Sequence, residues 1–455
     1  MKNFPGLLVC LLMFTSLTFA FEQVQVKFQQ YTLSNGLTVI LHEDHSAPVI
    51  ATVVWYHVGS KNEELHRTGF AHLFEHMMFQ GSEHVADDEH FKLLQEVGAN
   101  INGSTTEDRT NYFEVVPSNY LELALYLESD RMGFLLPAMT QAKLDNQRDV
   151  VKNERRQSYD NQPYGTASEK ISALMFPDAH PYHWPVIGYM EDLSAATMED
   201  VQNFFRTYYA PNNASLVIAG DFNEKEARKL IEKYFGEIPR GKSFERPKPI
   251  AVTIPQTQRV MFEDKVKLPR LFIDWLTAPM QTRDDAVLDV ISDILSSGKT
   301  SRLYKSLVYE KQIAQNVGAY QSGMEIGGQF EIDVTAKPGK TLVEIETAIN
   351  EEIEKLLKDG VTQKEIDNAL TSTEAGLINR LSTVLGKANQ LSSYHIFTGD
   401  AENINKEMKR FENITPDEVR NIAKKYLSGN TIVLSIVPQG KGELAAQNST
   451  MWKGN

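Results

Sequence analysis

Apolar and polar positions between residues 68 and 81 follow the period of an amphipathic α-helix. Thr68 can cap the start of this helix, and Gly81 can end it. One stripe, at the spacings i, i+3, i+4, i+7 and i+8, is apolar and is expected to face a core: Phe70, Leu73, Phe74, Met77 and Met78. The opposite side carries polar groups and one ring: His72, Glu75, His76 and Phe79. The pattern predicts a helix that packs on one side and presents two imidazoles and a carboxylate on the other.

Strand patterns precede this helix, and a charged helix follows it. The segment TVILHEDHSAPVIATVVWYHVG, residues 38–59, contains two β-branched runs joined by a connection of hairpin length. The segment QAKLDNQRDVVKNERRQSYD, residues 141–160, is predicted to be helical. Strands that return through short connections, with the helices grouped together, indicate α+β layers rather than a doubly wound sheet.

A repeat divides the chain into two halves. The segment ATMEDVQNFFRTYYAPNNASLVIAGD begins at Ala196, and ITPDEVRNIAKKYLSGNTIVLSIVPQ begins at Ile414. Both read as a Thr-capped helix, a turn and a β-branched strand. Matching residues keep one offset, since Thr197 and Thr415 are 218 positions apart. Chance similarity is the alternative, but an offset near half the chain length favours duplication. We therefore predict two homologous α+β domains.

The boundary between the halves is predicted in IPRGKSFERPKPI, residues 238–250, where prolines and charges interrupt any regular pattern. The division that follows has five parts: a leader (1–20), a first domain (21–240), a linker (241–250), a second domain (251–445) and a tail (446–455).

The first twenty residues, MKNFPGLLVCLLMFTSLTFA, have the features of a signal peptide. One lysine precedes an apolar run that is too short to span a bilayer, and small residues follow at Thr18 and Ala20. A membrane anchor is the less favoured alternative because polar residues interrupt the run. Cys10 is the only cysteine, so the exported chain would have neither disulfides nor thiolate ligands. These features predict a periplasmic protein that is not inserted in the membrane after leader cleavage.

The charge of the chain narrows the range of partners. The formal net charge is -14, and the apolar content of 42% is ordinary for a soluble globular protein. An acidic surface argues against nucleic acid or an anionic membrane as a partner.

The polar side of the helix over 68–81 suggests a metal site. Two histidines at i and i+4 on one helix face can chelate a single zinc ion. Glu75 lies between them, where it can take a proton from a zinc-bound water. A solvated polar face is the alternative, and a metal site needs a third ligand. On spacing alone, Glu154 in the segment 141–160 would be an ordinary surface glutamate on the same helix face as Gln147 and Val151.

The motif HLFEHMMFQG, followed 78 residues after His76 by Glu154 in VVKNERR, resembles the inverted-motif zinc peptidases of the pitrilysin family. This family includes insulin-degrading enzyme and mitochondrial processing peptidase. Further matches run through both halves: SNGLTVILHEDHSAPV, GANINGSTTEDRTNYFEVV, HPYHWPVIG and GKTSRLYKSL. The resemblance covers nearly the whole chain after the leader.

The resemblance implies a zinc metalloendopeptidase with one Zn²⁺ per chain. It implies His72, His76 and Glu154 as zinc ligands and Glu75 as the general base. It also implies two domains that each consist of an antiparallel sheet with helices on one face. The segment matching an extended-substrate strand is Asn102, Gly103, Ser104 and Thr105. The second half has no match to the zinc motif and is expected to be an inactive homologous domain.

Two features, at three positions, depart from the family pattern. Gln147 occurs where many members have a glutamate seven residues before the third ligand, which makes the surroundings of the metal less anionic. Val308 and Gln315, in LVYEKQIAQ, occupy positions where members that act alone or as identical pairs have arginine and tyrosine. Candidates to replace these two groups are Arg302, Tyr304 and Tyr309.

We therefore expect a peptide substrate and a heterodimer, in which a homologous non-catalytic subunit supplies the arginine and the tyrosine. Two alternatives remain: a non-proteolytic scaffold subunit of the same fold, and a peptide-binding protein with a structural metal.

Overall fold

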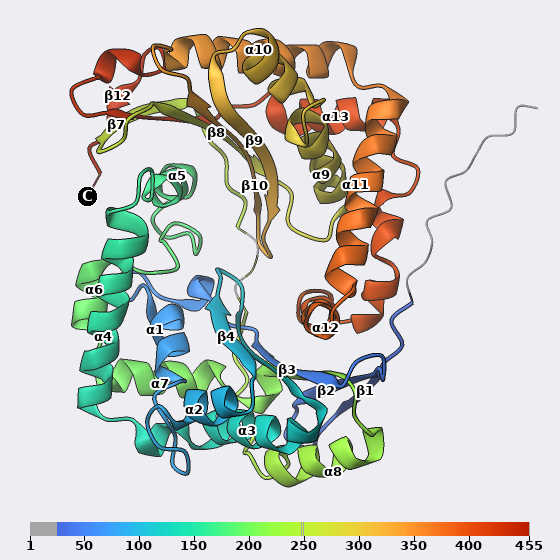
Figure 1. Ribbon diagram of the computed structural model, residues 1–455. Helices are drawn as coiled ribbons and strands as arrows, with labels where there is room; N and C mark the ends of the chain where they lie inside the picture. The colour runs from blue at the N-terminus through green and yellow to red at the C-terminus, as the bar shows by residue number, and fades with distance from the viewer. Residues whose placement is uncertain (1–24, 247, 249, 455) are drawn as a thin grey trace, which may run out of the picture.

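The computed structural model describes residues 25–454 except 247 and 249, and the predicted leader lies outside this range. Two halves each contain a six-stranded sheet with helices packed against it (Figure 1). The first sheet has the order β1-β2-β6-β3-β5-β4, and the second has the order β12-β7-β11-β8-β10-β9. The strands of the first half are β1 (Gln29–Thr32), β2 (Thr38–Glu43), β3 (Val49–Tyr56), β4 (Asn100–Thr105), β5 (Thr110–Pro117) and β6 (Ala214–Gly220). Those of the second half are β7 (Gln258–Asp264), β8 (Arg270–Thr277), β9 (Ala314–Gly323), β10 (Gly328–Ala336), β11 (Ile432–Pro438) and β12 (Thr450–Met451).

The helices fall into two corresponding groups. The first half contains α1 (Phe70–Met77), α2 (Glu89–Glu96), α3 (Leu121–Ala138), α4 (Gln141–Arg155), α5 (Ala167–Met175), α6 (Met190–Ala195), α7 (Met198–Tyr208) and α8 (Glu224–Phe235). The second half contains α9 (Arg283–Ser296), α10 (Leu342–Asp359), α11 (Gln363–Leu381), α12 (Val384–Thr398) and α13 (Pro416–Leu427). No helix within the described residues is both long and apolar enough to cross a bilayer.

The predicted duplication is present in the topology. Five strands follow the same order in both sheets, with β2, β6, β3, β5 and β4 matching β7, β11, β8, β10 and β9. The repeated helix-strand unit is α7 with β6 in the first half and α13 with β11 in the second. Thr197 and Thr415 cap the two helices, accepting the backbone N–H of Asp200 and Glu418. The prediction of two homologous α+β domains is therefore confirmed.

The expectation of purely antiparallel sheets was wrong. β2 runs parallel to β6, and β7 runs parallel to both β11 and β12. Each sheet is mixed because its late strand, β6 or β11, arrives after a long helical crossover and lies beside the first long strand of its half. Residues 446–455, which the sequence set apart as a tail, include β12 at the edge of the second sheet. Between α8 and β7 the described residues contain no helix or strand, where the linker was predicted.

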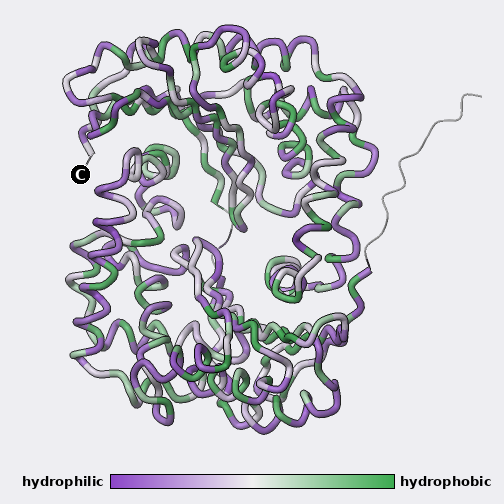
Figure 2. The backbone as a smooth tube through the Cα atoms, viewed as in Figure 1, coloured by the Kyte–Doolittle hydropathy of each residue, from purple (hydrophilic) through white to green (hydrophobic). Residues whose placement is uncertain are grey.

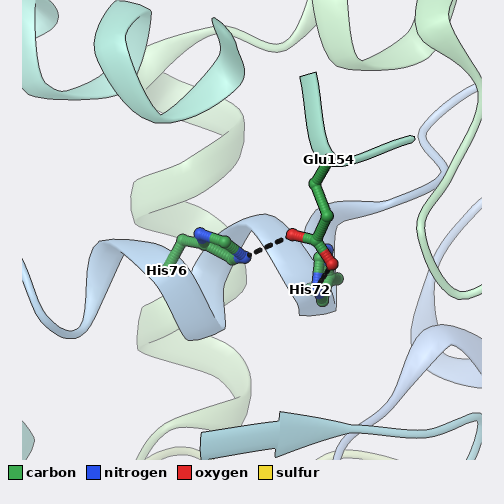
Figure 3. Close-up of side chains that lie close together, drawn as sticks. All are labelled: His72, His76 and Glu154. Carbon is green, nitrogen blue, oxygen red and sulfur yellow. Dashed lines mark ion pairs between the residues drawn. The ribbon is translucent and has the colours of Figure 1, made fainter. Parts of the chain in front are cut away.

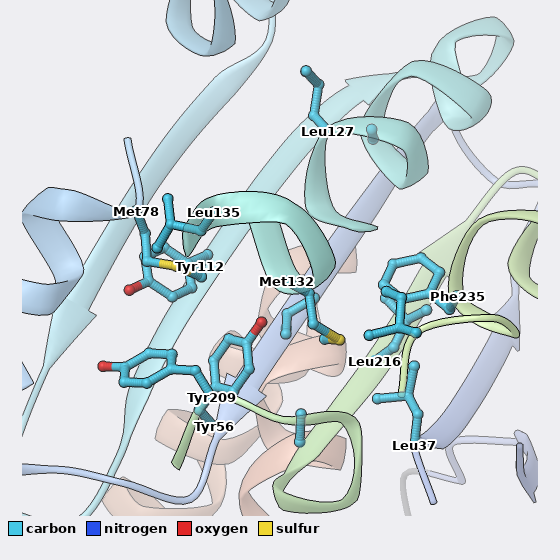
Figure 4. Close-up of a cluster of buried hydrophobic side chains, with 14 of the residues drawn as sticks. Leu37, Tyr56, Met78, Tyr112, Leu127, Met132, Leu135, Tyr209, Leu216 and Phe235 are labelled. Carbon is cyan, nitrogen blue, oxygen red and sulfur yellow. The ribbon is translucent and has the colours of Figure 1, made fainter. Parts of the chain in front are cut away.

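The outer helices and the first sheet enclose a large core. Figure 2 shows hydrophobic residues running through the first sheet, while the outer helices alternate in character. In this core the rings of Tyr56, Tyr112 and Tyr209 interlock, with centroids 6.0 Å apart for Tyr56 and Tyr112 and 4.8 Å apart for Tyr56 and Tyr209 (Figure 4). Aliphatic side chains such as Leu216 and Met132 pack beside them. This packing supports the sheet from the side on which α1 lies.

Helices also cover the inner face of each sheet. The expectation of helices on one face only was therefore incomplete. Helix α12 of the second half packs against β3 and β6, where Leu391 and Tyr394 join Ile40, Val53 and Val217 in one buried cluster. Helix α5 of the first half packs reciprocally against β11. Each half thus completes the apolar surface of the other, and the two are expected to unfold together.

Replacing Leu391 by Ala tests this joint core. The side chain is fully buried against the first sheet, so the change should lower the free energy of unfolding by about 2 to 5 kcal/mol. Urea denaturation followed by far-UV circular dichroism and by tryptophan fluorescence should show one coincident transition at lower urea. Val343→Ala on α10, where the side chain is 39% exposed, should change the stability by less than about 0.5 kcal/mol. Two separated transitions in the wild type would contradict the joint core.

Candidate metal centre

Helix α1 begins one residue later than the sequence predicted. Thr68 does not cap it, because its hydroxyl donates to Asp192 at 2.7 Å. The cap position is Gly69, with φ of 84°, and an added Cβ there would lie 2.8 Å from the carbonyl oxygen of Ile187. The buried carboxylate of Glu63 instead accepts the N–H groups of Gly69 and Ala71 at 2.9 and 2.8 Å. A carboxylate at the N-terminus of a helix also interacts favourably with the positive end of the helix dipole.

The two sides of α1 divide as predicted. All five residues of the apolar stripe are at most 4% exposed: Phe70, Leu73, Phe74, Met77 and Met78. The imidazoles of His72 and His76 project from the opposite side, with ring centroids 4.8 Å apart. The helix ends at Met77, four residues before the predicted end at Gly81.

Helix α4 brings a carboxylate to these imidazoles (Figure 3). Glu154 Oε2 lies 3.2 Å from His76 Nε2, and Glu154 Oε1 lies 3.7 Å from His72 Nε2. The three side chains offer ligand atoms that all lie within 4.8 Å of one another. The structure thus places together the three residues that the family resemblance implied as ligands.

This donor set fits zinc. Ligand atoms about 2.0 to 2.1 Å from a tetrahedral ion lie roughly 3.3 Å from one another, close to the two distances between Glu154 and the imidazoles. Burial lowers the pKa of His72 to about 4, with His76 contributing in the same direction and Glu154 opposing it. The contact with His76 lowers the pKa of Glu154. At neutral pH the group therefore provides a neutral imidazole at His72 and a charged carboxylate, the protonation states that bind a metal ion.

Glu75 lies between this group and strand β4. Its Oε2 accepts the hydroxyl of Thr105 at 2.6 Å, and its side chain is 3.0 Å from the position that a Cβ on Gly103 would occupy. Burial raises the pKa of Glu75, while the Thr105 hydroxyl acts in the opposite direction. A carboxylate with a raised pKa accepts a proton more readily near neutral pH, as a general base must. Gly103 leaves the space that Glu75 fills.

Strand β4 is one of the two edge strands of the first sheet. Thr106 N–H donates to Arg109 O at 2.9 Å, which makes Ser104 and Asn111 the next hydrogen-bonded pair along the hairpin. The N–H and C=O groups of Gly103 and Thr105 therefore point away from the sheet. Asn102 Oδ1, which is exposed, accepts the Gly103 N–H at 2.9 Å. An extended peptide can displace this side chain and pair with the edge.

The remaining residues singled out by the sequence are not part of this donor group. Gln147 is buried on α4, two turns before Glu154. Val308 is partly buried against the second core, and Gln315 is exposed on β9. The Arg302 guanidinium donates to Glu365 Oε1 at 2.7 Å, whereas the side chain of Tyr309 is exposed.

Arg109 and Glu63 belong to the site but were missed by the sequence reasoning. The Arg109 guanidinium donates to Ser104 O at 2.7 Å and to Asn111 Oδ1 at 3.0 Å, and thereby braces β4. A charged residue in a polar hairpin gives no local signal of this role. A glutamate just before the zinc-motif helix is a weak signal for capping.

Comparison with known proteins gives matches over both halves. The family described as "Insulinase (Peptidase family M16)" matches residues 38–180, and "Peptidase M16 inactive domain" matches residues 195–373. The chain is 27% identical over 431 residues to "Zinc protease PqqE" of Helicobacter pylori, covering 93% of this chain and 96% of the relative. It is 22% identical to the "Probable mitochondrial-processing peptidase subunit beta" of Arabidopsis thaliana, covering 89% of this chain and 77% of the relative.

Two solved structures share the fold. A protease from Helicobacter pylori superposes with a TM-score of 0.83 at 26% identity, covering 90% of this chain and 99% of that one. A peptidase M16 inactive domain from Pseudomonas fluorescens gives a TM-score of 0.81 at 19% identity, covering 93% and 99%, and shows the fold alone.

Replacing His72 by Asn tests the donor set. The wild type should retain about one zinc per chain after dialysis. The variant should bind zinc roughly 100-fold or more weakly, because mutation of residues that only hydrogen-bond a zinc ligand already lowers the affinity about 10- to 100-fold. Competition with a chelating dye measures both. His84→Asn is the matched control, because that imidazole pairs with Asp130 at 2.6 Å outside the group. Equal zinc affinity in His72→Asn and the wild type would exclude this site.

Proposed function

The chain belongs to the pitrilysin-type M16 peptidase family, and from this premise we propose that it is a zinc-dependent endopeptidase that hydrolyses peptides or unfolded polypeptide segments. The observation that carries the proposal is the position of Glu75. Its carboxylate is near enough to His76 and Glu154 for their charges to act on its pKa, and it accepts the hydroxyl of the substrate-strand residue Thr105.

His72, His76 and Glu154 would hold the zinc ion. The chemistry that zinc supplies when bound is the acidification of water, whose pKa falls to about 7. Three protein ligands would leave one position for water, as in catalytic zinc sites.

The residues of the chain perform the other tasks. Glu75 accepts the proton of the attacking water and delivers it to the leaving amine. The Thr105 hydroxyl orients Glu75 through their 2.6 Å hydrogen bond. The outward backbone groups of Gly103 and Thr105 bind the peptide as an added strand, so that recognition depends on the peptide backbone more than on its side chains. Asn102 and Ser104 flank these groups along the edge.

Two positions in the second half bear on whether this chain needs a partner subunit. Val308 and Gln315 cannot supply an arginine and a tyrosine. Gln315 also lies eight residues, about 26 Å, from the end of β9 at Gly323, where the turn toward β10 begins. We therefore propose a heterodimer with a homologous subunit that lacks the zinc motif. The features of residues 1–20 support export to the periplasm.

The alternative is a non-proteolytic scaffold or peptide-binding subunit of the same fold. The name "Peptidase M16 inactive domain" over residues 195–373 is consistent with a second half that has no chemistry of its own. The donor group in the first half favours the peptidase.

Replacing Glu75 by Gln separates these functions. The amide keeps the shape of the side chain but cannot accept the proton, so turnover of a fluorogenic oligopeptide should fall about 10²- to 10⁴-fold while zinc content stays unchanged. The matched control is Glu351→Gln, which alters an exposed pair with Lys311 and should retain full activity. Unchanged turnover in Glu75→Gln would refute the assigned base, and no turnover in the zinc-loaded wild type with its partner would favour the scaffold.

The heterodimer gives a separate test. The exported chain, purified alone with zinc, should hydrolyse the oligopeptide at least about tenfold more slowly than the complex isolated from its native cells, because loss of one oxyanion donor costs about 10²- to 10³-fold. Native mass spectrometry of that complex should show a second, different chain. Full activity of the isolated chain would contradict the requirement for a partner.

A further inference from the structure

A hairpin of the second half reaches into the first half beside the candidate site. Strands β9 and β10 extend from the second sheet toward β4 (Figure 1). Their turn is closed by Met324 N–H, which donates to Gly327 O at 2.8 Å, and Glu325 lies at its tip. The second half therefore touches the region of the site although it has no zinc motif.

Glu325 joins a buried ionic cluster of the first half. Its Oε2 lies 2.6 Å from His57 Nε2 and also accepts the ammonium of Lys61. Its backbone N–H donates to Asp108 Oδ2 at 2.9 Å. Lys61 Nζ in turn donates to Asp108 Oδ1 at 2.9 Å, and the Lys61 and Asp108 side chains are only 2% and 5% exposed. Tyr182 completes the cluster by donating its hydroxyl to Asp108 at 2.7 Å.

We propose that Glu325 is a positioning residue for the peptidase reaction: it holds the β4–β5 hairpin, and with it the substrate strand and Glu75, in working geometry. This inference rests on the proposed function for its meaning in catalysis. Its structural part, the support of the β4–β5 hairpin by the second half, can be measured without substrate or metal.

The contacts form an unbroken path from Glu325 to the substrate strand. Asp108 lies in the turn of the β4–β5 hairpin, three residues after Thr105. In the same turn, the backbone N–H of Asp108 and that of Arg109 both donate to Thr106 Oγ1 at 3.2 Å. Arg109 then braces Ser104 O at 2.7 Å. A shift of Asp108 is therefore transmitted to Ser104 and Thr106, the two neighbours of Thr105, which contacts Glu75.

A second path leads to helix α1. Lys61 lies in the short helical turn η1 (Ser60–Asn62), whose N–H groups bind the same hairpin: Ser60 N–H donates to Thr106 O at 3.1 Å and Lys61 N–H donates to Glu107 O at 3.0 Å. Glu63 follows directly and caps α1. The cluster thus fixes the substrate strand and the start of the zinc-motif helix to one point.

Charge explains why Glu325 matters at this point. Lys61 is almost fully buried and has two carboxylate partners, Asp108 and Glu325. Without Glu325, the Lys61 ammonium keeps only Asp108, and His57 loses its charged partner. Buried polar groups left unpaired are costly, so water or an altered hairpin must compensate.

Hydrogen–deuterium exchange of the metal-free full chain tests the support directly. In Glu325→Ala, amides of residues 100–117 should exchange at least about tenfold faster than in the wild type, while the β2 and β6 amides stay unchanged. Glu325→Gln retains the length and the acceptor oxygen and should remain within about threefold of the wild type. Glu351→Ala, which removes an exposed ion pair of the second half, is the control and should change nothing in this hairpin.

Peptide hydrolysis by the zinc-loaded complex tests the catalytic part. Glu325→Ala should lower kcat about tenfold, with KM within about twofold of the wild type and with unchanged zinc content. The reason is that small misplacements of catalytic groups strongly lower the rate of the chemical step. Glu325→Gln should restore most of the rate.

Exchange in the β4–β5 hairpin that is equal in Glu325→Ala and the wild type would overturn the inference, as would faster exchange spread evenly over both halves. If Glu325→Ala does not fold, faster exchange in Glu325→Gln that is spread evenly over both halves would also overturn it. A wild type without peptidase activity would refute the proposed function but leave the exchange result valid.

Discussion

The candidate site depends on the contact between helices α1 and α4, which sets the distance from Glu154 to the two imidazoles. Helix α4 is fixed at its end by Arg155, whose guanidinium donates to Gly188 O at 2.8 Å and to Glu169 Oε2 at 2.8 Å. Gly188 lies directly against Gly69. A Cβ added at Gly188 would lie only 2.4 Å from the Cα of Gly69. The residue beside Glu154 and the start of α1 are therefore held by the same loop. Glycine at both positions permits this close approach.

Local pattern was sufficient for α1 but not for the residues that complete its site. The apolar stripe from Phe70 to Met78 determines which side of the helix is buried, so the sequence placed His72 and His76 correctly. The cap was misplaced because Asp192, 124 residues away, binds the Thr68 hydroxyl. Glu154 looked like a surface residue, and only the family resemblance marked it, since its position depends on tertiary packing. The parallel strand pairs and the crossing of α5 and α12 likewise depend on long-range packing, which the periodicity of single segments does not encode.

Duplication has left the two sheets with edges of different accessibility. In the first half the outward Gly103 N–H is covered only by the exposed side chain of Asn102. At the corresponding edge strand β9, the Ser296 hydroxyl from α9 accepts the Ala319 N–H at 2.9 Å and donates to the Ala319 C=O at 3.2 Å. Both outward groups at that position are thus occupied by one side chain that is anchored on a helix. A protected edge resists pairing with another strand, whereas the edge beside Glu75 is open to exchange with a peptide.

Helices α12 and α5 each pack against the sheet of the other half and thereby oppose separation of the two halves. Separating the halves would expose two buried clusters, one between α12 and the first sheet and one between α5 and the second. Each apolar Å² exposed costs about 25 cal/mol, and the hairpin tip would also withdraw Glu325 from the buried Lys61. An opening motion that separates the two halves is therefore unfavourable. The two shared clusters and the Glu325 contact therefore favour motion of the halves together, as one unit.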